Sequence, residues 1–316
     1  MRVFVTGATG VVGRRLVPLL TAAGHTVTAA GRDTSRMAAL ARAGAATIGL
    51  DLFDRGAVRR AIDGHDVVVN LATHLPASSF ATMLPWAWRE NDRIRRDASA
   101  LIVDEARAAG VPRFIQESFA PIYEDAGSRW IDEDAPVRTG RNNRSVVDAE
   151  RSAHRFSERG GTGIVLRFAG FYGPDSRMLH DMLPLVRRGI SPVPGAPDAF
   201  WSSISHDDAA TAVVAALTAP AGIYNVSDDE PLTRMAWAGA LADAAGAGRP
   251  RPMPRWMTRL MGSVGEVLSR SQRISNAKLR ATGWTPRWPS AREGLRAALA
   301  SERAIVPHAP APVAHR

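Results

Sequence analysis

The chain has 316 residues and a formal net charge of +9, with 45% hydrophobic and 22% charged residues. This balance is typical of a globular protein with a sizeable core, and no apolar run reaches the roughly 20 residues that a membrane-spanning helix needs. The absence of cysteine excludes a disulfide, a thiolate nucleophile and a cysteine-ligated metal. We therefore expect a cytoplasmic protein without a membrane partner, either a monomer or a homodimer.

The positive charge does not indicate a nucleic-acid partner. The arginines are spread along the chain in short pairs, and the aromatic residues, 6% of the total, do not alternate with them as a base-stacking groove would require. We expect a small-molecule substrate, no nucleic acid and no metal site.

Short apolar runs alternate with amphipathic stretches in the first half of the chain. Each apolar run is predicted to be a strand, at residues 2–7, 26–31, 46–52, 66–72, 113–119 and 163–170. Helices are predicted between the strands, at residues 11–24, 36–44, 57–64 and 95–110. Strands that are apolar on both faces and alternate with helices predict an α/β protein with a Rossmann-type, doubly wound parallel sheet.

The alternation breaks after residue 170, where prolines and glycines become frequent. We predict a nucleotide-binding domain over residues 1–170, with some later strands interleaved into its sheet. A smaller C-terminal α/β lobe over residues 171–303 would bind the substrate. The Pro/Ala-rich tail at residues 304–316 is predicted to be disordered.

The segment "TGATGVVG" places Gly7, Gly10 and Gly13 between the first strand and its helix. Glycines let the backbone approach a pyrophosphate, and the N-terminus of the following helix supplies N–H groups to the anion. The string alone is also compatible with an ordinary tight turn. The strand before it and the helix after it favour a dinucleotide site.

The end of the second strand indicates which dinucleotide is preferred. NAD sites usually place a carboxylate there for the ribose 2′-hydroxyl, whereas this strand ends in Gly31 and Arg32. A guanidinium can pair bidentately with a 2′-phosphate, so we predict NADP(H) over NAD(H). The alternatives are a surface role for Arg32 and an inward-turned Asp33.

Several further segments, in order from residue 1 to about residue 300, resemble the extended short-chain dehydrogenase/reductases, also described as NAD-dependent epimerase/dehydratases. They are "GLDLFD", "VVNLATHLP", "LRFAGFYGP", "ISHDDAATAVVAAL" and "GWTPRWPSAREGL". The resemblance implies cofactor contacts by Gly7, Thr9, Gly10, Val11, Val12, Gly13, Arg32, Asp51, Leu52, Leu71, Ala72, Thr73, Asn91, Phe168 and Gly170.

The catalytic residues of that family do not align. The family has a serine or threonine near the end of the fifth strand and a Tyr-x-x-x-Lys pair on the next helix, whereas the aligned positions here hold Phe119, Asn142 and Val146. The only tyrosines are Tyr123, Tyr172 and Tyr224, and Lys278 is the only lysine, so the chain contains no Tyr-x-x-x-Lys string.

Other residues could replace the missing groups. Ser118, Glu117 and Tyr123 lie at the end of the predicted fifth strand, where doubly wound sheets bind ligands, and His74 follows the fourth strand at the same edge. An apolar substrate pocket is predicted from His74, Trp86, Trp88, Phe119, Phe171 and Trp201. Arg144 and Asp148, one helical turn apart, are expected to form an exposed pair. His206 with its two following aspartates is expected to cap a helix rather than to bind metal.

Together these features predict an atypical NADP(H)-dependent oxidoreductase acting on a small, partly apolar molecule. It would transfer hydride without the usual tyrosine–lysine acid–base pair, for which a conjugated or cationic acceptor is suited. The alternatives are a non-catalytic NADP(H)-binding sensor or scaffold and a non-redox cyclase or isomerase on the same fold.

Overall fold

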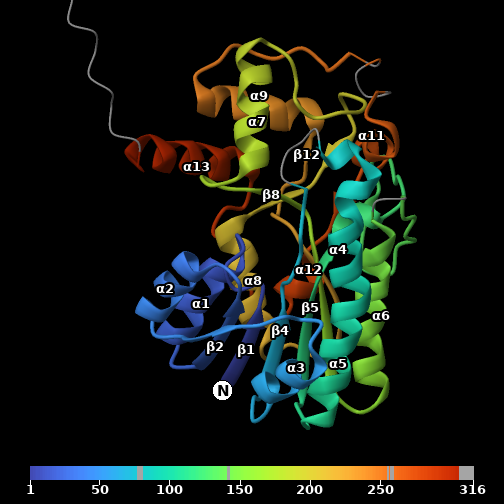
Figure 1. Ribbon diagram of the computed structural model, residues 1–316. Coiled ribbons are helices and arrows are strands. Elements are labelled where there is room, and N and C mark those ends of the chain that lie inside the picture. Colours follow the sequence, from blue (N-terminus) through green and yellow to red (C-terminus); the bar gives the residue numbers. More distant parts are fainter. Residues whose placement is uncertain (77–80, 141–142, 255, 257–259, 306–316) are drawn as a thin grey trace, which may run out of the picture.

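The computed structural model describes residues 1–76, 81–140, 143–254, 256 and 260–305. A central parallel sheet is covered by helices on both faces, and a smaller lobe lies above the carboxyl ends of its strands (Figure 1). No helix in these ranges is long and apolar enough to cross a membrane.

The sheet has seven strands in the order β11-β7-β5-β4-β1-β2-β3, and every pairing in it is parallel. The strands are β1 (Arg2–Thr6), β2 (Thr26–Gly31), β3 (Ala46–Gly49), β4 (Val67–Asn70), β5 (Arg113–Phe119), β7 (Thr162–Phe168) and β11 (Gly222–Val226). The chain runs outward from β1 to β3 and then returns to build β4, β5 and β7 on the other side. The order therefore reverses between β1 and β4, which is where such sheets bind dinucleotides.

Two hydrophobic layers hold the helices against the sheet. On one face, α1 (Gly13–Ala22), α2 (Thr34–Arg42) and α8 (His206–Ala216) pack on side chains such as Val5 and Ile115. On the other face, α3 (Arg55–Ile62), α5 (Ser99–Ala108) and α6 (Arg144–Glu158) pack on side chains such as Phe4 and Phe114. The alternation of side chains along each strand explains why neighbouring residues belong to different layers.

The smaller lobe has its own core, made largely by α7 (Arg177–Arg187), α9 (Arg234–Ala245) and α13 (Ala291–Ile305). The helix α11 (Gly262–Ser269) lies against the short turns Ala81–Met83 and Ala120–Ile122, and α12 (Ala277–Arg280) packs against β11 of the sheet. Three short strand pairs connect this lobe to the sheet: β8 (Gly170–Tyr172) with β10 (Ser203–Ser205), β9 (Phe200–Trp201) with β12 (Leu232–Thr233), and β6 (Trp130–Ile131) with β13 (Arg273–Ile274).

The structure confirms the predicted fold class and shifts several predicted elements. The strands expected at residues 46–52 and 66–72 end at Gly49 and Asn70, and the one expected at 163–170 is divided between β7 and β8. The helix expected at residues 95–110 begins earlier, as α4 (Arg89–Arg93), and continues through a π-helical turn at Ile94–Ala98 into α5. Residues 304 and 305 belong to the end of α13, so the predicted tail starts too early there, and its remainder lies outside the described residues.

Candidate active site

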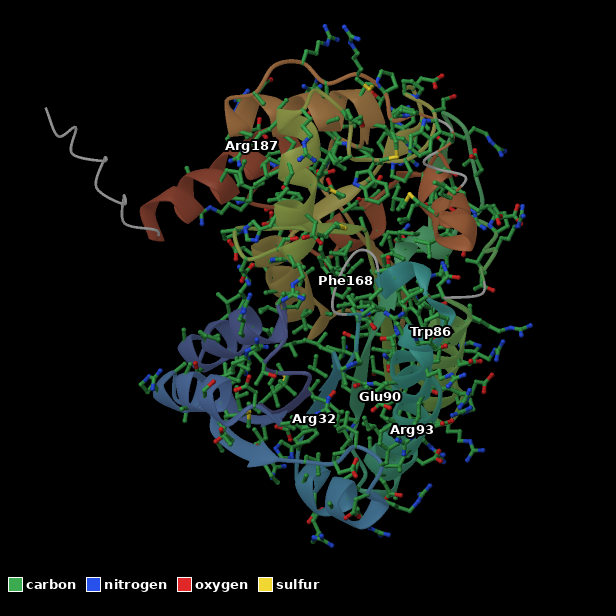
Figure 2. The ribbon with its side chains drawn as sticks, turned by 45° about the horizontal axis from the view of Figure 1, so that its top comes forward. Arg32, Trp86, Glu90, Arg93, Phe168 and Arg187 are labelled. Carbon is green, nitrogen blue, oxygen red and sulfur yellow. The ribbon has the colours of Figure 1, made fainter. Side chains whose placement is uncertain are left out.

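A cavity of about 770 Å³ lies at the carboxyl ends of β1, β2, β3 and β4. Figure 2 labels three of the side chains around it, Arg32 from the end of β2 and Glu90 and Arg93 from α4. The predicted cofactor residues that line the cavity are Gly7, Thr9, Gly10, Arg32, Asp51, Leu52, Leu71, Ala72 and Thr73. The cavity thus has the position and the lining expected of a dinucleotide site.

The glycines of the loop after β1 have different physical roles. A β-carbon on Gly7, whose φ is +64°, would lie 2.4 Å from the carbonyl oxygen of Leu71, so only glycine lets this loop pack against the end of β4. A β-carbon on Gly13 would lie 2.5 Å from the Gly7 carbonyl oxygen. At Gly10 the same test meets only the Gly7 oxygen, at 3.2 Å, and the position otherwise borders open cavity. We call this space beside Gly10 the glycine cradle. A side chain at residue 10 would fill it, and a pyrophosphate would fit into it.

Two guanidinium groups, those of Arg32 and Arg36, line the cavity at the end of β2. Asp33 is diverted from it, because its carboxylate caps α2 by accepting the Arg36 backbone N–H at 3.0 Å and the Ser35 hydroxyl at 2.8 Å. These bonds lower the pKa of Asp33. The structure therefore does not show an inward-turned Asp33. Asp33 Oδ2 instead lies 3.2 Å from Arg36 Nε, so Arg36 is paired with this carboxylate and the Arg32 guanidinium lies beside the pair at this wall.

The opposite wall was missed in the sequence. It consists of Phe53 together with Glu90, Arg93 and Ile94, and the Arg93 guanidinium carbon lies 3.6 Å from the centre of the Phe53 ring. Glu90, Arg93 and Ile94 follow the three- and four-residue spacing of one helix face. That spacing is the signal that could have identified them, had α4 been predicted.

The remaining predicted cofactor residues do not line this cavity. Val11 accepts Arg15 Nη1 through its carbonyl oxygen, Val12 precedes α1, and Gly13 packs on the loop. Asn91 is fully buried and accepts the backbone N–H of His74 at 3.1 Å. Phe168 is buried against Phe171, and Gly170 packs against Trp201.

Ser118 and Tyr123 are members of a buried hydrogen-bond network, and neither lines the cavity. The Ser118 hydroxyl donates to Glu150 at 2.5 Å, and Arg167 makes two hydrogen bonds of 2.8 Å to the same carboxylate. Arg167 also donates to the Tyr123 oxygen at 2.8 Å, and Tyr123 donates to Asn225. Burial raises the pKa of Tyr123 to about 12, which is unsuited to proton transfer near neutral pH.

The other predicted site residues are dispersed. Val146 is fully buried in α6, Asn142 lies outside the described residues, and His74 is exposed. Trp86 is 61% exposed, whereas Trp201 lies in the core of the smaller lobe. The remaining aromatic candidates Trp88, Phe119 and Phe171 are partly buried. The structure does not bring these aromatic side chains together into one wall of the cavity.

Two predicted polar contacts were wrong. Asp148 pairs with Arg151 at 2.7 Å rather than with Arg144. The cap of α8 is Ser205, whose hydroxyl accepts the Asp208 backbone N–H at 2.9 Å, rather than His206.

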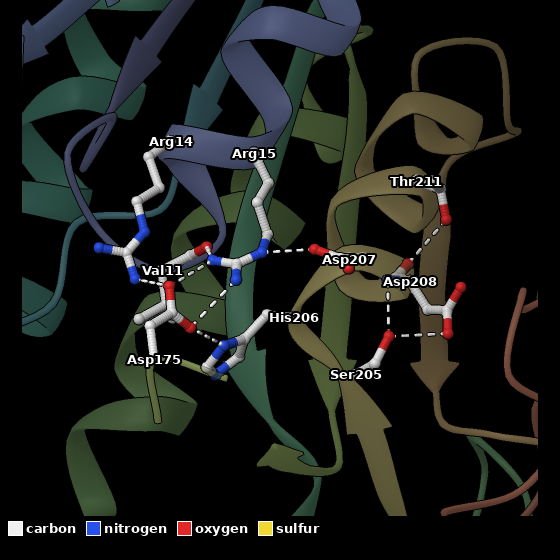
Figure 3. Close-up of polar contacts among 9 residues, drawn as sticks. All are labelled: Val11, Arg14, Arg15, Asp175, Ser205, His206, Asp207, Asp208 and Thr211. Atoms are coloured by element: carbon white, nitrogen blue, oxygen red, sulfur yellow. Dashed lines mark hydrogen bonds and ion pairs between the residues drawn. The ribbon is translucent and has the colours of Figure 1, made fainter. Parts of the chain in front are cut away.

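His206 instead belongs to a cluster that joins α1 to the smaller lobe (Figure 3). Asp175 accepts hydrogen bonds from Arg14 and Arg15, and its carboxylate also lies 2.8 Å from His206 Nδ1. Arg15 additionally pairs with Asp207 at 2.5 Å. Burial, with the nearby guanidinium groups of Arg15 and Arg14, lowers the pKa of His206 to about 3. The ring is therefore neutral, and Nδ1–H donates to Asp175.

The sheet, the glycine cradle and the cavity define a dinucleotide-binding protein of the Rossmann class. A family model described as NAD(P)H-binding matches residues 7–174. A Streptomyces protein named 3-diazoavenalumate denitrifying reductase is 35% identical over 310 residues, which cover 93% of this chain and 99% of that protein. The chain belongs to the NAD(P)H-binding family and is an extended short-chain dehydrogenase/reductase.

Solved structures agree with this fold. The human epimerase family protein SDR39U1, solved with NADPH, superposes with a TM-score of 0.78 at 22% identity and covers 95% of this chain and 99% of its own. The UDP-glucose 4-epimerase of Thermus thermophilus, solved with NAD, superposes with a TM-score of 0.77 at 23% identity, covering 97% and 100%.

Replacing Gly10 with valine should abolish dinucleotide binding while the fold is retained. The added side chain would occupy the cradle but would meet only one protein atom closely. Binding can be measured by nucleotide fluorescence, and folding by circular dichroism. Gly13→Val is the contrasting variant, because its side chain would collide with backbone and should prevent folding. Normal dinucleotide binding by Gly10→Val would mean that the loop is not the binding site.

The buried neutral His206 should make the protein less stable as the pH falls. In the unfolded chain the His206 imidazole has a pKa near 6.5, whereas in the folded protein its pKa is about 3. Between these values the unfolded state is protonated and the folded state is not. Stability is thus lost from pH 6.5 downward, by about 2 kcal/mol at pH 5. Urea unfolding at pH 7 and pH 5 should show this loss shrinking by that amount in His206→Asn. The exposed His154→Asn is the control, and equal pH slopes in all three proteins would contradict the assignment.

Proposed function

We propose that this protein is an NADPH-dependent reductase that transfers hydride to the diazo-bearing carbon of an aromatic compound and releases N₂. The single observation that supports the proposal is that the sequence contains no Tyr-x-x-x-Lys string. Our alignment assigns the lysine position to Val146, which is fully buried, and Ser118 and Tyr123 are bonded into an interior network.

The chemistry explains why such an enzyme would not need that pair. Reduction of a ketone leaves an alkoxide, which must receive a proton from the enzyme. In an arenediazonium ion, hydride joins the ring carbon, the carbon–nitrogen bond breaks with its electron pair passing to nitrogen, and the products are the arene and N₂. The acceptor gains two electrons and one hydrogen nucleus from the dinucleotide, and no proton enters or leaves.

The relative supports this class of acceptor. The Streptomyces protein is named for a diazo compound and for denitrifying reduction, and it aligns with 93% of this chain. When bound, the reduced dinucleotide supplies the hydride. The chain's own contribution is to hold that dinucleotide through the glycine cradle and to orient the acceptor, and positioning alone can provide a large part of the rate.

The preference for NADPH rests on the cationic wall at the end of β2. Gly31 leaves space where a carboxylate would stand in an NAD site, Arg32 and Arg36 line the cavity, and Asp33 is held in the cap of α2. Bidentate guanidinium–phosphate bonds would bind a 2′-phosphate at this wall.

Arg32→Ala should weaken NADPH binding by about 1.5–3 kcal/mol, the value of a charge-assisted hydrogen bond, and change NADH binding little. Arg42→Ala is the matched control, because Arg42 is exposed at the C-terminal end of α2, the helix that follows Arg32, and does not line the cavity. Titration of both dinucleotides measures the preference. Equal NADPH and NADH affinities in the unmodified protein, or an unchanged preference in Arg32→Ala, would contradict the proposed recognition.

The reaction itself can be tested with NADPH carrying deuterium at the transferred position and arenediazonium carboxylates labelled with ¹⁵N. We expect deuterium at the ring carbon that bore nitrogen, and labelled N₂ in equal amount to the NADP⁺ formed. Gly10→Val corrects for spontaneous reduction. Tight NADPH binding without reduction of any diazonium, ketone, enone or imine would instead identify a non-catalytic sensor, and turnover of ketones alone would refute the diazo assignment.

A further inference from the structure

Polar atoms without hydrogen-bond partners gather where the carboxyl end of β5 meets the π-helical turn. The Arg95 guanidinium donates from Nη2 to Glu117 Oε1 at 2.6 Å, and both side chains are largely buried, with 4% and 12% exposure. Glu117 Oε2, Arg95 Nε and Asn91 Nδ2 are buried and have no partner among the described residues. A buried, unbonded carboxylate oxygen is costly, which indicates that a ligand satisfies it. A π-helical turn within an α-helix is frequent at functional sites.

The sheet register places Glu117 next to a residue that lines the cofactor cavity, although Glu117 itself is not in the lining. Asn70 of β4 is paired with Gln116 of β5, so Leu71 and Glu117 are the next positions along the two neighbouring strands. Leu71 lines the cavity. Ser118 bonds Glu150 of α6, and Gln116 bonds Asn70, which also bonds Ser99 of α5. By the alternation of side chains along a strand, Glu117 belongs to the opposite face with Ile115, whose layer contains Ala8 and Val12 of the glycine loop.

The positions of the residues that line the cavity indicate how a bound dinucleotide would be oriented along the strand ends. Arg32 and Asp51 lie at the ends of β2 and β3, and the glycine loop lies at the switch point. If Arg32 holds the 2′-phosphate and Gly10 accommodates the pyrophosphate, the residues available to the nicotinamide would be those at the ends of β4 and β5. Glu117 is the ionisable side chain at that end of β5.

We propose that Glu117 forms a binding site for a cationic aromatic ring, with Oε2 as its acceptor and Arg95 holding the carboxylate in place. The inference rests on the proposed function. Hydride transfer would pass one positive charge from the diazonium acceptor to the oxidised cofactor, so a cation would be present before and after the transfer. Oε2, the carboxylate oxygen that Arg95 leaves unbonded, would attract that cation from a buried position.

The test compares Glu117→Gln with Glu105→Gln. Glu105 is a matched control, because it is also a buried carboxylate, is also bonded through one oxygen to an arginine, Arg55, and also has an unbonded Oε2. It lies on α5 and pairs with α3, whereas Glu117 lies at the carboxyl end of β5 next to a strand whose end lines the cavity. We expect Glu117→Gln to weaken NADP⁺ binding on the order of tenfold relative to NADPH binding. Glu105→Gln should leave that ratio unchanged. Both constants are equilibrium values, so the result does not depend on turnover or on the identity of the substrate.

A second arm distinguishes the two rings. N-methylquinolinium and its neutral analogue 1-methylnaphthalene are titrated into the NADPH-bound protein by calorimetry. Selective loss of the cationic probe in Glu117→Gln assigns the site to the acceptor, whereas a changed NADP⁺ to NADPH ratio assigns it to the cofactor, and either result supports the proposal. Unchanged values in both arms, with circular dichroism showing a folded variant, would overturn it.

Folding of the single variant is a separate matter, because it leaves Arg95 buried without its counter-ion. The double variant Arg95→Met, Glu117→Met removes both charges with side chains of similar length, an exchange that buried ion pairs tolerate. The double variant should also weaken NADP⁺ binding relative to NADPH binding, whereas Glu117→Asp should weaken it less. A double variant that keeps the original ratio would also overturn the proposal. Failure of the diazonium assay alone, with the ratio changed, would refute the proposed acceptor and leave the cation site intact.

Discussion

The cofactor cavity and the joint between the two lobes both depend on the contact between the glycine loop and the end of β4. Gly7 has no side chain, so the loop can pack against the end of β4. A β-carbon on Gly7 would lie 2.4 Å from the Leu71 carbonyl oxygen, which is too close. This contact places the N-terminus of α1 above the point where the strand order reverses. It also places Arg14 and Arg15, on the first turn of α1, against Asp175 and His206. Any change in the loop is therefore expected to alter both the cradle and the lobe joint.

A second constraint is the buried network that holds Ser118 and Tyr123. Both carboxylate oxygens of Glu150 in α6 are bonded, to Arg167 and to Ser118. Arg167 then engages Tyr123, which fixes the end of β5 to β7 and, through Asn225, to β11. Such a network is strongly destabilised if one member is removed. Ser118 and Tyr123 thus connect β5 to α6, β7 and β11 in the interior, and neither lines the cavity.

The parallel sheet could be predicted because each strand is apolar on both faces, and β2 and β5 fall at the predicted residues, 26–31 and 113–119. The phosphate cradle and the cationic wall followed from local motifs. Features set by tertiary contact could not be predicted in this way. The choice of Arg151 over Arg144 as the partner of Asp148 depends on side-chain direction, and the wall of Glu90 and Arg93 depends on a helix that starts before its apolar pattern does. Burial of Ser118 and Tyr123 requires three separate elements to meet.

The two buried ion pairs near the end of β5 differ in how completely their polar atoms are hydrogen-bonded within the protein. In the pair of Arg167 and Glu150, every carboxylate oxygen is bonded and the side chains face α6, so the charge is neutralised within the protein. In the pair of Arg95 and Glu117, one oxygen and one guanidinium nitrogen have no partner among the described residues, and Glu117 lies on the face of the glycine loop. Folding alone would favour saturation of both pairs, since an unbonded buried oxygen costs free energy. In our proposal a cationic ligand binds next to the pair of Arg95 and Glu117. The free energy lost by leaving Glu117 Oε2 unbonded would be regained when that ligand binds.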